Sequence, residues 1–268
     1  MGWHQGLLVS FDLETTGTDV ERDRIVTAAL IRLDADGREA LRNTWLLDPG
    51  VPVPEEAAAI HGMTTAHVRA HGQAAAEGVE QIATALAAAL EAGLPLVVMN
   101  ARYDLSLLDR ECRRYGLPTP AERLGRPPAP VIDPLVLDKH VDRYRKGKRT
   151  LQALCRHYGV PLEAAHEAGA DAVAAAGVAR RIGERHPAVA GTALAALHAL
   201  QEEAAAEQAA SFQKYLRRSG DPGAIVEAAW PLIPYQRARE RPEELELDLP
   251  GQGREQGQGQ ASAARGSA

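Results

Sequence analysis

The chain has 268 residues, of which 45% are hydrophobic and 25% charged, which is enough for a good-sized folded α/β domain and excludes a chain that is disordered throughout. A formal net charge of −6 argues against a protein that wraps duplex DNA through a basic surface. The sequence contains no run of 18 apolar residues, no signal-peptide pattern and no CxxC spacing, so we expect a cytoplasmic protein with free thiols and no membrane contact.

The N-terminal part of the chain predicts a meander of three antiparallel strands. Residues 6–14 form the first strand, which runs into a Thr-Thr-Gly turn. Residues 25–33 and 41–47 form the next two strands, and the sequence DADG between them is typical of a hairpin. Three prolines then break regular structure before a short helix over residues 55–60.

The middle of the chain alternates helices with short strands. Apolar residues at helical spacing predict a helix over residues 74–91. Residues 94–99 are fully apolar, which is typical of a strand that is buried on both faces of a sheet. A helix over residues 104–115, a proline-rich stretch and a short strand at 131–133 follow. We therefore expect a mixed central sheet flanked by helices.

The C-terminal part predicts two further helices, a helical extension and a tail. Helices are expected over residues 150–158, with Thr150 as the N-cap, and over 168–186, so the compact domain should span residues 1–187. The extension, residues 188–234, carries a long Ala/Glu/Gln-rich helix that either packs on the domain or pairs with another chain, which leaves the oligomeric state open. Residues 235–268 are polar and rich in Gly and Gln, which predicts disorder.

Four acidic residues lie beside apolar segments, where a carboxylate is costly unless a cation neutralises it. Asp12 and Glu14 are two apart on a strand, so both side chains point to the same face, ~7 Å apart. Asp104 follows the strand at 94–99, and Asp171 falls in the first turns of a helix. A single acid of this kind is usually a solvated turn residue, but four acids from three elements could share one pocket. Hard divalent cations prefer oxygen ligands, so the set favours a site for two Mg²⁺ or Mn²⁺ ions.

One histidine accompanies these acids. His166 precedes Asp171 by five residues, a spacing that would separate the two side chains on a continuous helix. We therefore expect His166 in the loop before the helix, where an imidazole that titrates near neutral pH can take a proton from water.

The order and spacing of FDLETTG, NARYD and AHEAGADA resemble the DEDDh family of 3′–5′ exonucleases, which includes the epsilon proofreading subunit of DNA polymerase III. The resemblance covers about residues 6–183. It implies a ribonuclease H-like fold and two-metal hydrolysis of phosphodiester bonds. It implies His166 as the general base and four metal ligands: Asp12, Glu14, Asp104 and Asp171. Family members hold the terminal nucleotide at positions that correspond here to Thr15, Thr16, His61, Met63 and Asn100.

The expected activity is removal of nucleoside 5′-monophosphates from the 3′ end of single-stranded or frayed DNA, with a DNA polymerase or a clamp as candidate partner. Two alternatives stay open: an exoribonuclease of the same family that trims RNA, and a non-catalytic module that binds nucleic acid or a polymerase. The segment KHVDRYRKGKR, residues 139–149, carries six Lys or Arg and one acid. It is either a solvated loop or a loop that contacts phosphates near the metal pocket.

Overall fold

Three long strands build the centre of the fold in the computed structural model, which describes residues 2–162 and 165–235. They are β1 (Leu8–Thr15), β2 (Ile25–Leu33) and β3 (Glu39–Asp48). β1 pairs with β2 and β2 with β3, both antiparallel, which confirms the predicted N-terminal meander. The β1–β2 register shifts after Glu14, so the pairing becomes irregular where β1 ends.

Three short parallel strands complete the sheet. They are β4 (Gln73–Ala74), β5 (Leu96–Val97) and β6 (Val131–Ile132), and the six strands lie in the order β4-β3-β2-β1-β5-β6. β5 and β6 fall within the two short apolar segments predicted as strands, but only two residues of each meet the pairing geometry. The sheet is mixed because β5 runs parallel to β1 whereas β2 runs antiparallel to it.

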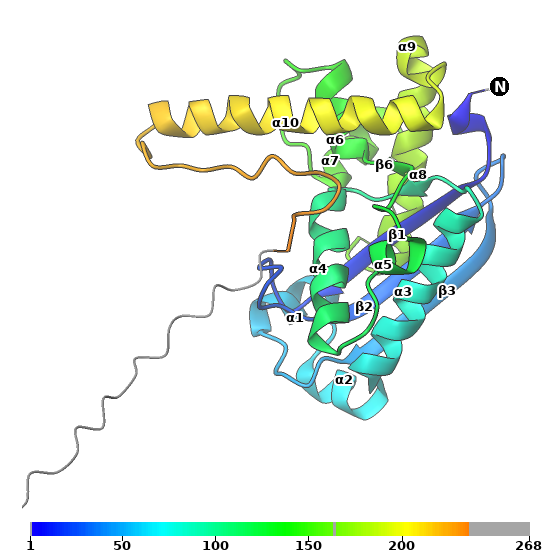
Figure 1. Cartoon of the computed structure of the whole chain (residues 1–268), viewed down its shortest axis with the longest axis vertical. Coiled ribbons are helices and arrows are strands. Elements are labelled where there is room, and N and C mark those ends of the chain that lie inside the picture. The colour runs from blue at the N-terminus through cyan, green and yellow to red at the C-terminus, as the bar shows by residue number, and fades with distance from the viewer. Residues whose placement is uncertain (1, 163–164, 236–268) are drawn as a thin grey trace, which may run out of the picture. The chain divides into compact units, whose positions relative to one another are not determined.

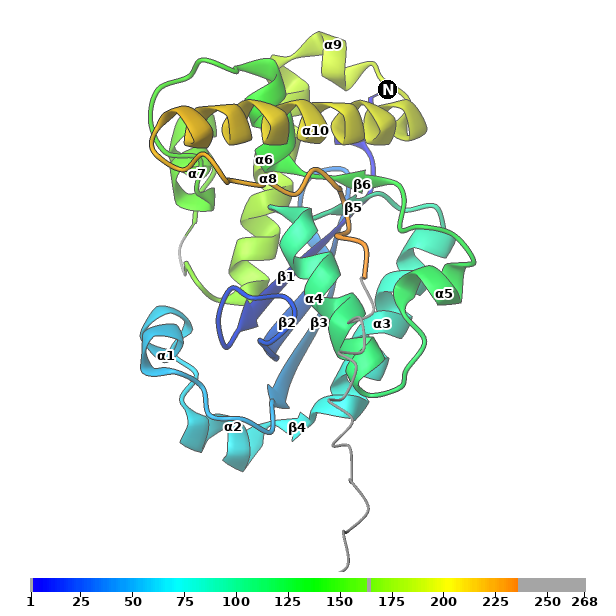
Figure 2. The ribbon, with the colours of Figure 1, turned by 60° about the vertical axis from the view of Figure 1, so that its left-hand side comes forward.

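Helices cover both faces of this sheet (Figures 1 and 2). One layer contains α3 (Ala75–Glu91), α4 (Ala101–Arg114) and the short α5 (Pro120–Leu124), which packs on α3. The opposite layer contains α8 (Ala168–Arg185), which contacts β1 and β2, and α7 (Leu151–Tyr158), which packs on α8. The mixed sheet between two helical layers agrees with the predicted α/β architecture.

Alternation along β1 decides which layer each side chain meets. Phe11 and Leu13 join the core on the side of α3 and α4, whereas Leu8 joins the core on the side of α8. Side chains alternate in a strand, so Asp12 and Glu14 share the face of Leu8 and lie toward α8. As expected from the sequence, the side chains of these two acids therefore point to the same face of the strand.

Several short helices join these layers. α1 (Glu55–His61) matches the predicted helix at 55–60, but α2 (Thr65–His71), α6 (Pro134–Val141) and the 3₁₀ helix at Trp3–Gln5 were not predicted. α6 begins with a proline, and its first two free N–H groups, after that proline, donate to the side chain of Asp133. Asp133 before Pro134 thus marks the start of α6, which the pattern of apolar residues did not indicate.

The helical extension packs on the rest of the fold. It consists of α9 (Pro187–Ala190) and α10 (Leu194–Arg218), which crosses one end of the sheet beside β6 and α6 (Figure 1). Gln201 is fully buried; its Nε2 donates to the carbonyl of Val131 (2.9 Å), and its Oε1 accepts from the N–H of Asp133 (2.7 Å). The side chain of Gln201 on α10 therefore continues the hydrogen bonding of the sheet beyond β6. The sequence left open whether the long helix packs on the domain or pairs with another chain, and the structure shows that it packs on the domain.

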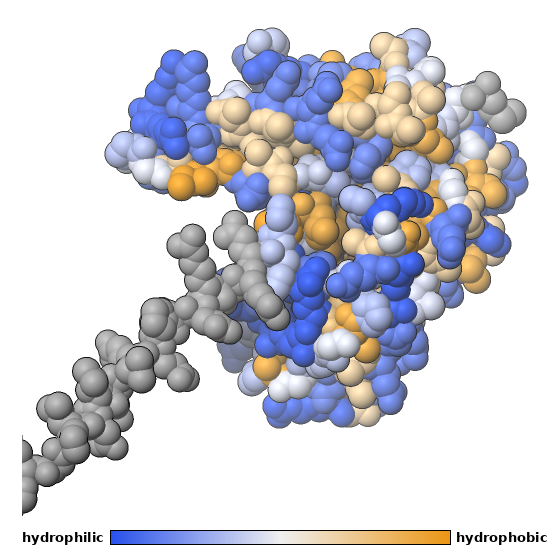
Figure 3. Space-filling view, viewed as in Figure 1, coloured by the Kyte–Doolittle hydropathy of each residue, from blue (hydrophilic) through white to orange (hydrophobic). Residues whose placement is uncertain are grey.

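An extended segment of residues 219–235, here called the C-terminal strap, follows α10. Figure 3 shows the end of α10 and the start of the strap projecting from the body of the molecule. The strap returns to α4, where the N–H of Ile233 donates to Ser106 Oγ (2.9 Å). Residues up to Tyr235 form one compact unit, with no division at residue 187. The tail predicted to be disordered lies, from residue 236 on, outside the described residues.

Candidate active site

Asp12 and Glu14 form the base of the candidate site, on the face of β1 that α8 covers. Burial raises the pKa of Asp12 well above its ordinary value, and the nearby carboxylates of Asp104, Asp171 and Glu14 raise it further. Burial and the charge of Asp171 raise the pKa of Glu14 from 4.5 to about 7. The strand therefore holds two carboxylates that resist ionisation unless a positive charge joins them.

Asp104 reaches the same place from α4. Asn100 adopts a left-handed conformation (φ 62°) that turns the chain from β5 into this helix, so Asp104 lies in its first turn. The buried carboxylate of Asp104 accepts a hydrogen bond from the N–H of Leu13 (3.1 Å), which ties α4 to β1 between Asp12 and Glu14. Burial raises the pKa of Asp104 well above its ordinary value, although its backbone hydrogen bonds oppose that effect.

Asp171 and His166 complete the site from the start of α8. Asp171 lies in the first turn of α8, and His166 lies in the preceding loop with a left-handed backbone (φ 69°) and an exposed ring. The N–H of His166 donates to Asp171 Oδ2 (3.2 Å). The other oxygen, Asp171 Oδ1, is buried and has no hydrogen-bond partner among the described residues. One potential ligand atom from each of Glu14, His166 and Asp171 lies within 4.8 Å of the others.

These contacts favour a divalent metal site. The acids come from three separate elements, and their charges act on one another: Asp104, Asp171 and Glu14 raise the pKa of Asp12, Asp171 raises that of Glu14, and Glu14 raises that of Asp104. A buried oxygen without a donor, such as Asp171 Oδ1, is a ready ligand for a cation. Carboxylate oxygens suit Mg²⁺ and Mn²⁺, so the donor set fits the ions that the sequence predicts.

His61 connects the end of α1 to the end of β1. Its Nδ1 accepts from the N–H of Met63 (3.1 Å), and its Nε2 lies 3.3 Å from the carbonyl of Thr15, to which it donates. Burial lowers the pKa of His61, and the acceptor role of Nδ1 also requires the neutral ring. His61, Met63 and His166 line a pocket of about 220 Å³ with Thr27 on the neighbouring strand.

The other three residues predicted to bind the nucleotide, Thr15, Thr16 and Asn100, lie outside the pocket at His61 and Met63. The Thr15 hydroxyl donates to the carbonyl of Gly17 (2.6 Å), and the buried Thr16 hydroxyl donates to Asp23 Oδ1 (2.8 Å), so both hydroxyls hold the loop after β1. Asn100 is exposed at the start of α4, and its backbone N–H is bound to Asp133. None of these three residues lines the pocket at His61 and Met63.

Two residues that the sequence interpretation did not assign support the site. The Tyr103 hydroxyl lies 2.8 Å from the Thr15 hydroxyl and also donates to Gly17, which fixes the loop after β1 to α4. Asp133 accepts from the N–H groups of Asn100 and Ala101 (both 3.0 Å), in addition to those at the start of α6. Its position directly before a proline was the available signal, but the contact with α4 depends on the tertiary fold.

Comparison with known proteins agrees with this geometry. The family model described as Exonuclease matches residues 9–179, which contain all four acids and His166. The DNA polymerase III PolC-type protein of Lacticaseibacillus paracasei is 30% identical over 166 residues, which are 62% of this chain and 10% of that protein. The DNA polymerase III subunit epsilon-like protein of Rhodobacter capsulatus is 33% identical over 173 residues, 63% of this chain and 22% of that protein.

A solved structure shows the same architecture. The crystal structure of E. coli Exonuclease I with a dA16 oligonucleotide aligns with a TM-score of 0.59 and 21% identity, over 69% of this chain and 42% of that chain. This likeness concerns the fold, and it confirms the ribonuclease H-like architecture expected from the motifs. The chain spans less than half of each of these three proteins.

Proposed function

The chain belongs to the Exonuclease family, and we propose that it removes nucleotides from the 3′ end of single-stranded or frayed DNA and releases nucleoside 5′-monophosphates. The observation that carries the proposal is the meeting of four acids from β1, α4 and α8 beside a histidine in a loop. Repulsion among these acids destabilises the metal-free fold. The proposed function explains why the acids lie together, because bound metal ions would remove the repulsion.

In this proposal the four acids bind metal ions and His166 accepts a proton. Two Mg²⁺ or Mn²⁺ ions would be held by the four carboxylates of Asp12, Glu14, Asp104 and Asp171. When bound, such ions neutralise charge on the phosphate and favour deprotonation of the attacking water. His166 lies within reach of Glu14 and Asp171, and its exposed ring can accept that proton.

Other side chains would position the substrate. His61 is neutral and fixed through both ring nitrogens, so it can shape the pocket without adding a cation. Met63 lies beside it and offers an apolar contact for a terminal base. Thr15 and Thr16 would act through the loop that their hydroxyls hold, and Asn100 through its exposed side chain at the start of α4.

The wider setting is also a proposal. The two relatives are named as DNA polymerase III proteins, and we propose that this chain acts in replication or repair of DNA in the cytoplasm, with a polymerase or its clamp as partner. None of the helices within residues 2–162 and 165–235 is long and apolar enough to cross a membrane.

The test is incubation of the protein with 3′-labelled and 5′-labelled DNA and RNA oligomers, with Mg²⁺ or with a chelator. We expect a 5′-labelled DNA ladder that shortens only with metal. Asp12→Asn should lower the rate by about 10²–10³-fold, because one carboxylate charge is lost where phosphate charge is neutralised. Faster loss of RNA than of DNA would favour the exoribonuclease, and intact oligomers of both kinds would favour the non-catalytic module.

A further inference from the structure

The basic segment at residues 139–149 contains two classes of cation. Arg145 (2.8 Å) and Arg149 both form ion pairs with Asp138, whose carboxylate is fully buried and also accepts from the Tyr158 hydroxyl (2.9 Å). These two arginines therefore shape the loop between α6 and α7. No ion pair is recorded in the described part of the chain for the other four cations of the segment, which are Lys139, Arg143, Lys146 and Lys148.

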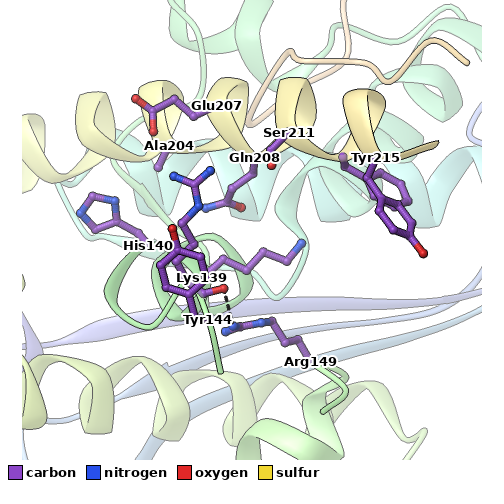
Figure 4. Close-up of a pocket in the computed structure, with 11 residues that line it drawn as sticks. Lys139, His140, Tyr144, Arg149, Ala204, Glu207, Gln208, Ser211 and Tyr215 are labelled. Carbon is purple, nitrogen blue, oxygen red and sulfur yellow. Dashed lines mark hydrogen bonds between the residues drawn. The ribbon is translucent and has the colours of Figure 1, made fainter. Parts of the chain in front are cut away.

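A groove of about 640 Å³ lies between this loop and α10. Lys139, Arg143 and Tyr144 line it from the side of α6 and the loop, and Phe212 and Tyr215 line it from α10. Figure 4 shows Lys139, Tyr144 and Arg149 below α10, with Tyr215 projecting from the helix toward the same space. Glu207 is the one carboxylate among the lining residues, so the groove is cationic although the whole chain is acidic.

Three aromatic side chains of the groove are unusually exposed. Tyr144 is 85% exposed, Tyr215 62% and Phe212 52%. The rings of Phe212 and Tyr215 are nearly parallel, at 14°, with centroids 6.3 Å apart. Exposed ring faces beside unpaired cations are the combination that binds single strands, because bases stack on the rings while cations contact phosphates. An apolar peptide would leave the cations desolvated and unpaired, so the groove suits it less well.

The groove continues toward α4 as a smaller cavity of about 100 Å³. Lys139, Gln208 and Phe212 line both spaces. The far end of the smaller cavity is lined by Asn100 and Arg102, at the start of the helix that carries Asp104. The two spaces therefore connect the first turn of α4 with the exposed rings of α10, with Arg102 and Lys139 as the cations of the smaller cavity and the buried Asp133 as the one acid among its described lining residues.

We propose that this groove binds the single-stranded segment upstream of the 3′ end, with Tyr144, Phe212 and Tyr215 stacking on bases and Lys139 and Arg143 contacting phosphates. The inference rests on the proposed exonuclease function and assigns a role to the helical extension, which lies beyond the matched residues 9–179. Only an oligomer long enough to reach from the acids to α10 would gain from these contacts.

The test compares oligo(dT) of about 4 and about 16 nucleotides, the range of single-strand site sizes. The double variant Phe212→Ala/Tyr215→Ala should raise KM for the long oligomer about tenfold, as expected for loss of base stacking. It should leave kcat, and KM for the short oligomer, unchanged. The double variant Lys139→Gln/Arg143→Gln should flatten the salt dependence of binding to the long oligomer. The matched control is Ile225→Ala, because Ile225 is an 85% exposed apolar residue that does not line the groove.

Fluorescence anisotropy of a labelled 16-mer, measured with a chelator, separates this inference from the proposed function. If the wild type degrades DNA but the aromatic variant keeps its preference for long oligomers, the groove does not bind the strand; a groove that serves a protein partner would give that result. If the wild type degrades nothing, the exonuclease proposal fails. In that case, weaker 16-mer binding by the aromatic variant still supports the groove, and unchanged or absent binding overturns it.

Discussion

Two groups of buried or half-buried carboxylates in this molecule have opposite electrostatic surroundings. At the candidate active site, burial and neighbouring acids raise the pKa values of Asp12 and Glu14. On α6, burial also acts to raise the pKa of Asp138, but hydrogen bonds from Arg145, Tyr158 and Arg149 outweigh it and the pKa is lowered. The negative charge of Asp138 is thus neutralised by arginines of the chain, whereas the negative charges of Asp12 and Glu14 have no such partner among the described residues.

This difference separates a structural acid from a ligand-binding one. Asp138 is neutralised by cations of the chain itself, and both of its oxygens have donors. Asp171 has one oxygen without a donor, and its charge raises the pKa values of Asp12 and Glu14. The fold supplies counter-charges at Asp138 but not at the four acids of the candidate site, which leaves those four to bind a cation from solution.

Asp138→Asn should have the largest effect on stability. The substitution leaves Arg145 and Arg149 without their buried partner, so we expect the free energy of unfolding to fall by about 3–5 kcal/mol. Urea unfolding measures it. The matched control is Asp36→Asn, because Asp36 pairs with Arg38 at an exposed site, where loss of an ion pair costs about 1 kcal/mol or less. Equal losses in the two variants would contradict the structural role of Asp138.

Trp230→Phe tests a third kind of buried acid, one that hydrogen-bond donors satisfy without a cation. Asp133 is buried, which raises its pKa, but the indole N–H of Trp230 (3.1 Å) and several backbone N–H groups oppose that effect. Removal of the indole donor should lower the free energy of unfolding by about 1–3 kcal/mol. Thermal unfolding and urea titration both measure the loss.

The matched control for this variant is Trp45→Phe. Trp45 donates to Gln81 at the surface (3.0 Å), so the same chemical change should cost less than about 0.5 kcal/mol there. A smaller loss for Trp230→Phe than for Trp45→Phe would mean that the C-terminal strap does not stabilise Asp133.

The N-terminal strands, the cap of α7 and the shared face of Asp12 and Glu14 could be predicted because local sequence patterns determine them. The period-two pattern of β1 places Asp12 and Glu14 on one face, and the hydroxyl of Thr150 caps α7 as expected, by accepting from the N–H of Ala153. The three N-terminal strands were predicted within two residues at each end, since alternation and turn residues mark them directly. Each of these features depends on neighbours within a few positions of the chain.

What could not be predicted depends on contacts between distant segments. The sequence predicted either a solvated loop or a phosphate-contacting loop at residues 139–149, but Arg145 and Arg149 are bound to Asp138, and only the fold decides which cations of the segment have such a partner. Likewise, Gln201 and Trp230 both bind Asp133 from segments 68 and 97 residues away, and no local pattern indicates such partners. The groove at α10 is formed by segments of this kind, so periodicity could not reveal it.

Glu14→Gln should have the smallest effect, and it tests the uncompensated charge directly. The folded-state pKa of about 7 lies above the ordinary 4.5, so ionisation of Glu14 costs the metal-free fold stability that is intact below pH 4.5 and is lost progressively as pH rises to about 7. Glutamine does not titrate. With a chelator present, the variant should therefore unfold at the wild-type temperature near pH 4 and a few degrees above it at pH 8.

Addition of Mg²⁺ should reverse the order of the two proteins at pH 8. A cation that binds only the folded state stabilises it in proportion to the logarithm of its concentration over Kd, and the wild type keeps the carboxylate that holds it. The variant loses that ligand, so its unfolding temperature should rise less with Mg²⁺, while Asp138→Asn should respond to the ion as the wild type does. A Glu14→Gln protein that is destabilised with chelator at pH 8 would show that this acid has a structural partner, as Asp138 does, and would remove the contrast between the two regions.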